Sequence, residues 1–249
     1  MSGSIKKRLD IVVFERGLAE SRQKAASMVL AGMVLVDGMP VSKAGAQIGQ
    51  DAAVSLKERG PAYVGRGALK LEGAASHFGL SFEGKAVMDV GASTGGFTDY
   101  MLRRGARKVY CVDVGHGQLH ISLRNDPRVE VLERTNIRHL ERQRIPEELD
   151  MAVIDVSFIS LRLVLPPVAA FIKPGGEVIA LVKPQFEAGR RDVGKGGVVK
   201  DQAVRDAVLG SVAAFASETG FNVTGSVQSP VEGLKKGNVE YFLYMRKGF

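Results

Sequence analysis

The sequence has few of the features that mark a secreted or membrane protein. Its 249 residues contain one cysteine, Cys111, so no internal disulfide can form and a cytoplasmic location is expected. Cys111 lies inside an apolar run, which favours a small buried side chain over a nucleophile. No apolar run approaches the roughly 18 residues of a membrane-spanning helix. The opening residues, MSGSIKKRLD, lack the apolar core of a secretory signal, so we expect no membrane as partner.

Histidine is scarce where a serine hydrolase would need it. The four histidines are His77, His116, His120 and His139, and none occurs later in the chain. A serine is a poor nucleophile without a neighbouring base, and an esterase places its base histidine late in the sequence. His116 and His120 have helical spacing but no evident third ligand, so no metal site is predicted.

The composition is that of a globular protein with an excess of positive charge. Hydrophobic residues make up 45% and charged residues 24% of the chain, close to ordinary usage. The net charge of +7 favours a polyanionic partner. A change of pattern near residue 60 predicts a small domain over residues 1–59, a linker over 60–66 and a large domain over 67–249.

The small domain has an α+β pattern. Two short helical patterns precede residue 32, with Ser21 as the expected N-cap of the second helix and Gly32 at its end. The alternating stretch MVLVDGMPV then predicts a hairpin that turns at Asp37 and Gly38. The stretch SRQKAASMVLAGMVLVDGMPVSK closely resembles the S4 RNA-binding domain, which implies that this domain binds RNA.

Basic residues gather in two places. In the small domain they lie on or beside the expected helices, a placement that suits RNA phosphates but is equally compatible with a solvated face. In the large domain the segment QFEAGRRDVGKGGVVK, residues 185–200, combines four glycines with basic side chains and is expected to close over RNA. The predicted RNA-binding residues are Lys6, Lys7, Arg8, Arg22, Lys24, Arg190, Arg191 and Lys195.

The large domain alternates strand-like and helix-like segments, which predicts an α/β fold with a doubly wound, mostly parallel sheet of seven strands. Five apolar runs have the character of buried parallel strands. A helix is expected over residues 201–220, and the last two strands have no helix between them, so the sheet is expected to end with an antiparallel strand. The predicted strands cover residues 85–90, 108–114, 129–133, 151–156, 177–183, 221–228 and 239–246.

The stretch DVGASTGGF after the first of these strands is compatible with three kinds of site. A dinucleotide-binding G-x-G-x-x-G loop is disfavoured because Ser93 stands in the place of the second glycine. The same residues match the G-x-S-x-G elbow of an esterase, but a late histidine is lacking. A loop for S-adenosylmethionine fits better, because this methyl donor has no phosphate to cradle.

Polar residues at the next strand ends extend this donor site. Asp113 offers a carboxylate to the adenosine hydroxyls, although a loop-capping aspartate or an NAD site would look the same. Thr135 and Asn136 follow the third strand, where an adenine edge could be recognised. The predicted donor-binding residues are Asp89, Gly91, Ser93, Gly95, Gly96, Phe97, Asp113, Asn136 and Asp155.

Four charged residues stand beside the predicted sheet. Asp155 and Lys183 each end an apolar strand, Glu240 opens the last strand, and Lys70 lies in a helical pattern before the first strand. Charges so close to a buried sheet are costly unless they are partnered. Their shared position makes them candidate catalytic residues, with structural ion pairs as the alternative.

Short blocks along the whole chain together resemble one family. They are RGALKL, DVGASTGGFTDYML, VDVGHGQL, RTNIR, DVSFISL, LVKPQFEAGR, KGGVV and GNVEYFLY. The family is that of TlyA (hemolysin A), ribosomal RNA 2′-O-methyltransferases with an S4 domain before an FtsJ-like domain. The resemblance implies a Rossmann-like S-adenosylmethionine-dependent methyltransferase fold. It also implies a partner, ribosomal RNA in a ribosomal subunit. The chain departs from the pattern at Gly65 and Ala68, where a serine and a glycine are expected.

The resemblance further places an FtsJ-type Lys-Asp-Lys-Glu tetrad on Lys70, Asp155, Lys183 and Glu240. Methylation of a ribose 2′-hydroxyl requires a base, and a lysine serves only when neutral, a form that burial and a second ammonium favour. We therefore predict that Lys183 accepts the proton and that Asp155 holds Lys183 and abuts the methyl donor. Lys70 and Glu240 are expected to fix the ribose.

The family implies cytidine as the target, in large-subunit RNA, small-subunit RNA or both. Two other functions are compatible with parts of the sequence. One is a non-catalytic RNA-binding ribosome factor that keeps the fold. The other is a membrane-lytic protein, which is disfavoured because no helix pattern is basic on one side and bulky-apolar on the other.

Overall fold

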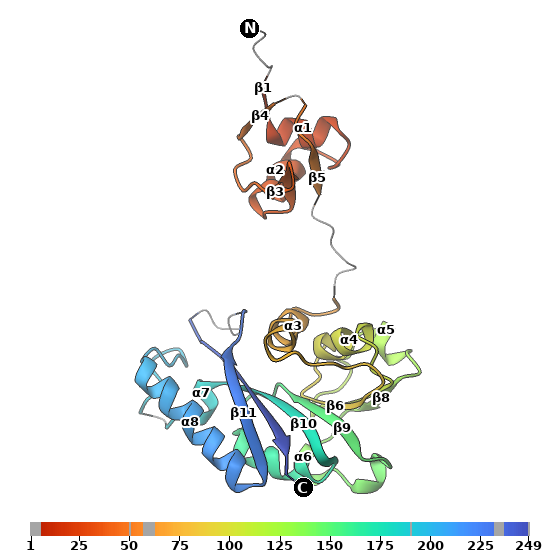
Figure 1. Ribbon diagram of the computed structural model, residues 1–249, viewed down its shortest axis with the longest axis vertical. Helices are drawn as coiled ribbons and strands as arrows, with labels where there is room; N and C mark the ends of the chain where they lie inside the picture. Colours follow the sequence, from red (N-terminus) through yellow and green to blue (C-terminus); the bar gives the residue numbers. More distant parts are fainter. Residues whose placement is uncertain (1–5, 50, 57–62, 190, 232–236, 249) are drawn as a thin grey trace. The chain divides into compact units, whose positions relative to one another are not determined.

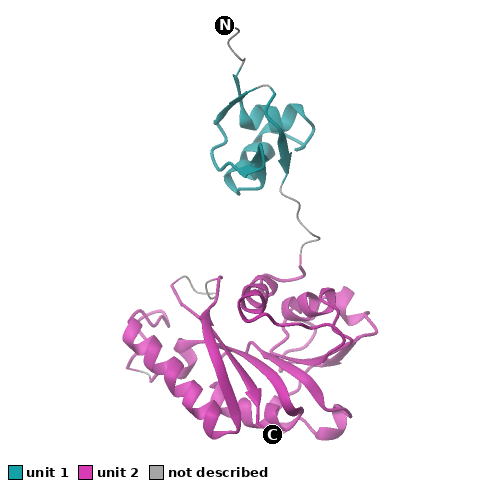
Figure 2. Cartoon of the chain, viewed as in Figure 1, with its two compact units in different colours: residues 1–62 teal, residues 63–249 magenta. Residues whose placement is uncertain are grey.

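The computed structural model divides the chain into two compact units, residues 1–62 and 63–249 (Figure 2). It describes residues 6–49, 51–56, 63–189, 191–231 and 237–248. Part of the predicted linker, residues 60–62, lies outside the described residues. Tyr63 and Val64 pack against the core of the second unit, so the end of that linker segment belongs to it.

The first unit is a small α+β domain built around two helices. Leu9, Val13, Ala25 and Val29 from these helices are fully buried together with Val34. Strands β1 and β4 pair in one antiparallel sheet, and β3, β2 and β5 form another. The elements are β1 (Lys6–Arg8), α1 (Leu9–Glu15), α2 (Arg22–Leu30), β2 (Val34–Val36), β3 (Met39–Pro40), β4 (Gln47–Gly49) and β5 (Val54–Leu56).

Two local predictions for this unit are confirmed. Ser21 caps α2, and its side chain accepts a hydrogen bond from the backbone N–H of Lys24 at 3.1 Å. Asp37 and Gly38 form the turn between β2 and β3 with φ of 51° and 80°, a left-handed pair typical of tight hairpins. The basic segment Lys6–Arg8 forms the short strand β1 immediately before α1.

The second unit contains the predicted seven-stranded sheet, in the order β11-β12-β10-β9-β6-β7-β8. β12 runs antiparallel to both of its neighbours, whereas the remaining paired strands are parallel. The strand order reverses between β6 and β9, which is where such folds bind ligands. The strands are β6 (Ala86–Val90), β7 (Lys108–Val112), β8 (Val129–Leu132), β9 (Leu149–Ile154), β10 (Ile172–Val182), β11 (Phe221–Gln228) and β12 (Tyr241–Lys247).

Helices cover both faces of this sheet, with α3 and α4 on one side and α6 and α8 on the other (Figure 1). Side chains of β10 alternate between the two cores: Val178, Ala180 and Val182 face α6 and α8, and Ile179 and Leu181 face α3 and α4. Burial on both faces explains why the strands are continuous apolar runs. The helices are α3 (Gly67–Phe78), α4 (Gly96–Arg103), α5 (Ile121–Arg124), α6 (Leu165–Ala169), α7 (Pro184–Glu187) and α8 (Gln202–Glu218), with the 3-10 turns η1 (Ile137–His139), η2 (Arg142–Arg144) and η3 (Leu161–Leu163).

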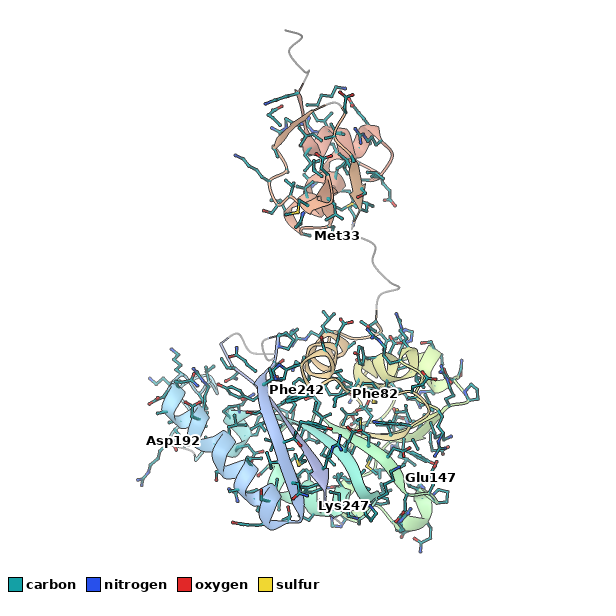
Figure 3. The ribbon with its side chains drawn as sticks, viewed as in Figure 1. Met33, Phe82, Glu147, Asp192, Phe242 and Lys247 are labelled. Carbon is teal, nitrogen blue, oxygen red and sulfur yellow. The ribbon has the colours of Figure 1, made fainter. Side chains whose placement is uncertain are left out.

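Aromatic side chains fill the core beneath α3 and α4. Phe82 and Phe242, both labelled in Figure 3, are 2% and 0% exposed. Phe242 lies in β12 two residues after Glu240, and its ring lies 6.2 Å from that of Phe97 in α4. This packing anchors the start of β12 beside the glycine-rich loop. Within the described residues, no helix combines the length and apolar character needed to cross a membrane.

Candidate active site

A cavity of about 670 Å³ opens where β6, β9 and β10 end, a size typical of small-molecule sites. The four charged residues singled out in the sequence, Lys70, Asp155, Lys183 and Glu240, all line it. They come from four places: α3, the carboxyl end of β9, the carboxyl end of β10, and the residue before β12. The remaining lining residues are Val64, Gly65, Arg66, Gly67, Gly91, Ala92, Ser93, Thr94, Gly96, Phe97, Ser157, Phe158, Gln185, Phe186, Gly197 and Asn238.

One wall of the cavity carries a closed ion pair. Lys70 Nζ donates to Glu240 Oε2 at 2.6 Å, and the two side chains are 7% and 3% exposed. Lys70 shares the inward face of α3 with the buried Ala74, so the helix delivers its ammonium to the sheet. Removal of one partner from a buried pair of this kind lowers the stability of the fold far more than formation of the pair raises it.

A second, more open ion pair also lines the cavity. Lys183 Nζ lies 2.5 Å from Asp155 Oδ1, and the side chains are 9% and 22% exposed. This contact is close but not aligned as a hydrogen bond, whereas Lys183 Nζ does donate a hydrogen bond to Ser157 Oγ at 2.9 Å. Lys183 therefore has two polar neighbours within the cavity wall.

The glycine-rich loop is shaped by left-handed residues. Gly91, Ser93 and Gly95 have φ of 86°, 49° and 93°. A Cβ at Gly91 would lie 2.4 Å from the backbone oxygen of Asp155, so only glycine lets the loop approach the end of β9 this closely. A Cβ at Gly95 would meet Leu123 of α5 at 2.2 Å, which gives that glycine a packing role.

The structure gives a local reason for one departure from the family pattern. A Cβ at Gly65 would lie 2.6 Å from Thr94 Oγ1, so a serine here would force Thr94 to move. The same segment crosses Gly96, where an added Cβ would approach the backbone nitrogen of Ala68 at 3.0 Å. The residues before α3 thus rest directly on the loop. Ala68 itself is fully buried.

The predicted donor-binding residues divide into two groups. Those among the cavity-lining residues are Gly91, Ser93, Gly96, Phe97 and Asp155. Asp89, Gly95, Asp113 and Asn136 are not among them and support the surrounding loops.

Asp113 and Asn136 are the loop-supporting residues at the ends of β7 and β8. Asp113 accepts hydrogen bonds from the backbone N–H groups of Ser93 and Gly115, both at 2.7 Å. Asn136 caps η1 by accepting from the backbone N–H of Arg138 at 3.1 Å. Asp113 therefore ties the glycine-rich loop to the end of β7.

Asp89 is completely buried beneath the glycine-rich loop. Thr98 donates a hydrogen bond to Asp89 Oδ2 at 2.6 Å, while Oδ1 has no partner. Burial, which disfavours the charged form, raises the pKa of Asp89 to about 7. Asp89 thus differs from the two cavity carboxylates, Asp155 and Glu240, which each have a lysine beside them.

The esterase alternative finds no support in this arrangement. Ser93 Oγ donates to Gln118 Oε1 at 3.3 Å, so the neighbour of the loop serine is an amide and not a histidine base. Across the described residues, no group of three or more histidine, cysteine, aspartate or glutamate side chains is arranged to hold a metal ion.

Ser157, Phe158, Phe186 and Asn238 are among the cavity-lining residues that sequence reasoning missed. Phe158 is 90% exposed, adopts φ of 64°, and its ring lies 5.0 Å from that of Phe186. An exposed phenylalanine in a left-handed conformation is uncommon, and such backbone outliers cluster at active sites. The available signals were the blocks DVSFISL, LVKPQFEAGR and GNVEYFLY, which contain these residues but do not show where their side chains point.

Asn238 connects the basic segment 185–200 to the start of β12. Its side-chain nitrogen donates to Gly197 O at 2.9 Å, and its oxygen accepts from the backbone N–H of Val199 at 3.3 Å. Of the RNA-binding residues predicted in this segment, Arg191 and Lys195 are exposed, and Arg190 lies outside the described residues. The segment is thereby held beside the cavity near Glu240.

The predicted RNA-binding residues of the first unit are all surface residues, but they are not equivalent. Arg8 and Arg22 both pair with the buried Asp10, at 3.0 and 3.3 Å, and the hydrogen bond from Arg8 is the main cause that lowers the pKa of Asp10. Lys7 pairs with Glu15 at 2.8 Å. Lys6 and Lys24 make no ion pair with the described residues.

Comparison with known proteins places this arrangement in a family. The FtsJ-like methyltransferase family model matches residues 63–247, and the S4 domain model matches residues 7–54. The 16S/23S rRNA (cytidine-2′-O)-methyltransferase TlyA of Mycobacterium tuberculosis is 47% identical over 242 residues, 96% of this chain and 89% of that protein. Hemolysin A of Brachyspira hyodysenteriae is 40% identical over 238 residues, 95% of this chain and 98% of that protein.

A solved structure is similar to this chain over nearly its whole length. A Streptococcus thermophilus protein with 44% identity superposes with a TM-score of 0.74, covering 98% of this chain and 89% of that one. The two family models account for the two compact units, and the long alignments extend through both. The chain therefore belongs to the TlyA family, in which an S4 domain precedes an FtsJ-like methyltransferase domain.

Proposed function

We propose that this protein methylates the 2′-hydroxyl of a cytidine in ribosomal RNA, with S-adenosylmethionine as donor and Lys183 as base. The observation that carries the proposal is the convergence of two lysines and two carboxylates with the glycine-rich loop on one cavity. The relative from Mycobacterium tuberculosis, named as an rRNA (cytidine-2′-O)-methyltransferase, supports the choice of substrate.

The donor site fits the residues that are present. S-adenosylmethionine, when bound, supplies a methyl group already activated on a sulfonium sulfur. Gly91, Ser93 and Gly96 line the cavity, and the close approach at Gly91 brings the glycine-rich loop against the end of β9. Asp113 retains lone pairs beyond the hydrogen bonds that it accepts from two backbone N–H groups. It can therefore also accept hydrogen bonds from the adenosine hydroxyls of the methyl donor. Asp155 faces the same cavity from the end of β9.

The remaining task of the protein is to orient a ribose and remove a proton from its hydroxyl. Lys183 accepts that proton in its neutral form, because an ammonium has no free lone pair. Asp155 holds Lys183 at 2.5 Å and brings it beside the donor site. Lys70 and Glu240, fixed to each other at 2.6 Å, offer one donor and one acceptor to the ribose.

An RNA substrate also accounts for the aromatic mouth of the cavity. The rings of Phe158 and Phe186 stand 5.0 Å apart beside the charged residues, and Phe158 is largely exposed. Unstacked bases in RNA stack on such aromatic side chains. We infer that the S4 domain and the basic segment 185–200 bind RNA around the target nucleotide, in a ribosomal subunit in the cytoplasm.

The decisive experiment uses S-adenosylmethionine with a tritiated methyl group and ribosomal subunits that lack the modification. We expect label in RNA at a cytidine whose 3′ phosphodiester resists alkali, because 2′-O-methylation removes the nucleophile for alkaline cleavage. Lys183→Ala should give no label, and Lys173→Ala, which changes a lysine paired with Asp150 outside the cavity, should label normally. Label on a base, or RNA binding without transfer, would contradict the proposal, and the second result would favour a non-catalytic ribosome factor.

A further inference from the structure

Ser157, which is not one of the four charged residues, makes a hydrogen bond with Lys183. Its hydroxyl accepts the aligned hydrogen bond from Lys183 Nζ at 2.9 Å, whereas the closer Asp155 Oδ1 is not aligned for one. Ser157 follows Asp155 by two residues, lines the cavity and is exposed to it. The side chain that sets the direction of the Lys183 amine is thus a neutral hydroxyl.

The geometry of an amine explains what this contact can do. The nitrogen of lysine has three directions besides its bond to Cε, and in the neutral form two hold N–H groups and one holds the lone pair. Ser157 occupies one of these directions from the cavity wall, whereas Asp155 Oδ1 lies 2.5 Å from the nitrogen without being aligned with an N–H. With one N–H donated to Ser157, the lone pair takes one of the two remaining directions and can face the cavity that Lys183 lines.

We propose that Ser157 is a positioning residue that directs the lone pair of Lys183 toward the ribose hydroxyl. This inference rests on the proposed function, in which Lys183 is the base. Without the hydroxyl, the neutral amine can turn its lone pair toward the vacated direction, where no substrate lies. The number of productive orientations falls, although the charge pair with Asp155 remains.

The fold fixes the positions of Ser157 and Lys183 relative to each other. Lys183 leads directly into α7, whose last residue is Glu187. Glu187 accepts hydrogen bonds from Ser160 Oγ at 2.6 Å and from the backbone N–H of Leu161 at 2.7 Å. The segment after Ser157 is therefore tied to the segment after Lys183. Phe158, in a left-handed conformation, turns the chain between Ser157 and Ser160. The hydrogen bond between Ser157 and Lys183 closes this loop at its cavity end.

The test compares Ser157→Ala with Ser157→Thr, which keeps the hydroxyl, and with Ser217→Ala as a matched control. Ser217 lies on α8, where its hydroxyl donates to Ala213 O, outside the cavity. We expect Ser157→Ala to lower the single-turnover rate of methyl transfer about 10- to 100-fold, since small misplacements of a reacting group have effects of this order. Affinity for S-adenosylhomocysteine and the RNA concentration for half-maximal rate should stay unchanged, and Ser157→Thr should recover most of the rate.

A wild-type rate for Ser157→Ala would overturn the inference, as would a rate loss accompanied by lost S-adenosylhomocysteine binding or by no recovery in Ser157→Thr. Lys183→Ala, measured in parallel, separates this failure from failure of the proposed function. If Lys183→Ala is inactive while Ser157→Ala is normal, only the role of Ser157 is wrong. If Lys183→Ala transfers methyl groups normally, the base assignment fails, and the role of Ser157 fails with it.

Discussion

The two lysine–carboxylate pairs of the cavity contain the same chemical groups in different surroundings. Lys70 and Glu240 are 7% and 3% exposed and bond directly to each other. Lys183 and Asp155 are 9% and 22% exposed, and the exposed Ser157 lies beside them. Neither charge nor their own exposure, 7% and 9%, distinguishes the two lysines, but their partners do: Asp155 is 22% exposed and Glu240 is 3% exposed. A base must reach the hydroxyl that it deprotonates, which the more open surroundings of Lys183 allow. The open pair is therefore suited to proton transfer, and the closed pair is suited to stability and positioning.

The largest expected effect comes from breaking the open pair at its lysine. Lys183→Ala should reduce the single-turnover rate by about 10²- to 10⁴-fold, the range that a positioned general base contributes. Binding of S-adenosylhomocysteine, measured by calorimetry, should change little. If Lys70→Ala lowered the rate while Lys183→Ala did not, the roles assigned to the two pairs would be reversed.

Breaking the closed pair should instead cost stability. Lys70→Ala leaves the carboxylate of Glu240, 3% exposed, without a counter-charge, and the free energy of unfolding should fall by about 3–5 kcal/mol. Lys183→Ala should cost less, about 1–3 kcal/mol, because it leaves the buried Asp155 Oδ1 unpaired while the rest of that side chain, 22% exposed overall, reaches solvent. Urea-induced unfolding of the full chain measures both values.

The matched control for Lys70→Ala is the double variant Lys70→Met with Glu240→Gln, which removes both charges and should recover much of the lost stability. Equal losses in Lys70→Ala and Lys183→Ala would remove the distinction between a closed and an open pair.

Asp89 extends the comparison to a buried carboxyl group that has no lysine. Its pKa, raised by burial to about 7, means that the folded protein keeps a proton that the unfolded chain loses above the ordinary pKa of 3.8. The unfolded state then binds fewer protons, so stability falls as pH rises from about 4 to 7. Asp89→Asn cannot ionise and should lack this decline, which is worth up to a few kcal/mol at about 1.4 kcal/mol per pKa unit.

Unfolding free energies at pH 4 and pH 7 test this prediction. The wild-type protein and Asp89→Asn should be similar at pH 4 and should diverge in favour of the variant at pH 7. Parallel pH dependence in the two proteins would show that Asp89 does not titrate in this window.

The sequence predicted the buried strands and the charged residues that end them. Buried parallel strands are continuous apolar runs, so the strands and the charged residues at their ends, Asp155 and Lys183, were visible as breaks in the pattern. The start of β10 at Ile172 was missed, because the register shifts between Ile172 and Glu177, where Pro174 and two glycines interrupt the run.

Pairing and orientation could not be obtained from the sequence. Nothing in the chain indicates that Lys70 bonds to Glu240, 170 positions away, because that contact depends on how α3 crosses the sheet. The left-handed φ of Phe158 and the hydrogen bond of Ser157 to Lys183 depend equally on tertiary contacts. Asp113 was predicted from its place at a strand end, but its bond to the backbone of Ser93 is a property of the folded loop.

The smallest expected effect comes from a lysine that is neither buried nor paired. Lys24, exposed at the start of α2, makes no ion pair with the described residues, in contrast to Arg22, which Asp10 holds at 3.3 Å. If Lys24 contacts an RNA phosphate, Lys24→Ala should weaken binding to ribosomal RNA severalfold and lower the slope of log affinity against log salt by about 1. Filter binding at several salt concentrations measures this slope, and Lys173→Ala removes the same charge from the other unit as a control. An unchanged slope for Lys24→Ala would assign that lysine to a solvated face, and RNA affinity would then depend on the arginines that Asp10 orients.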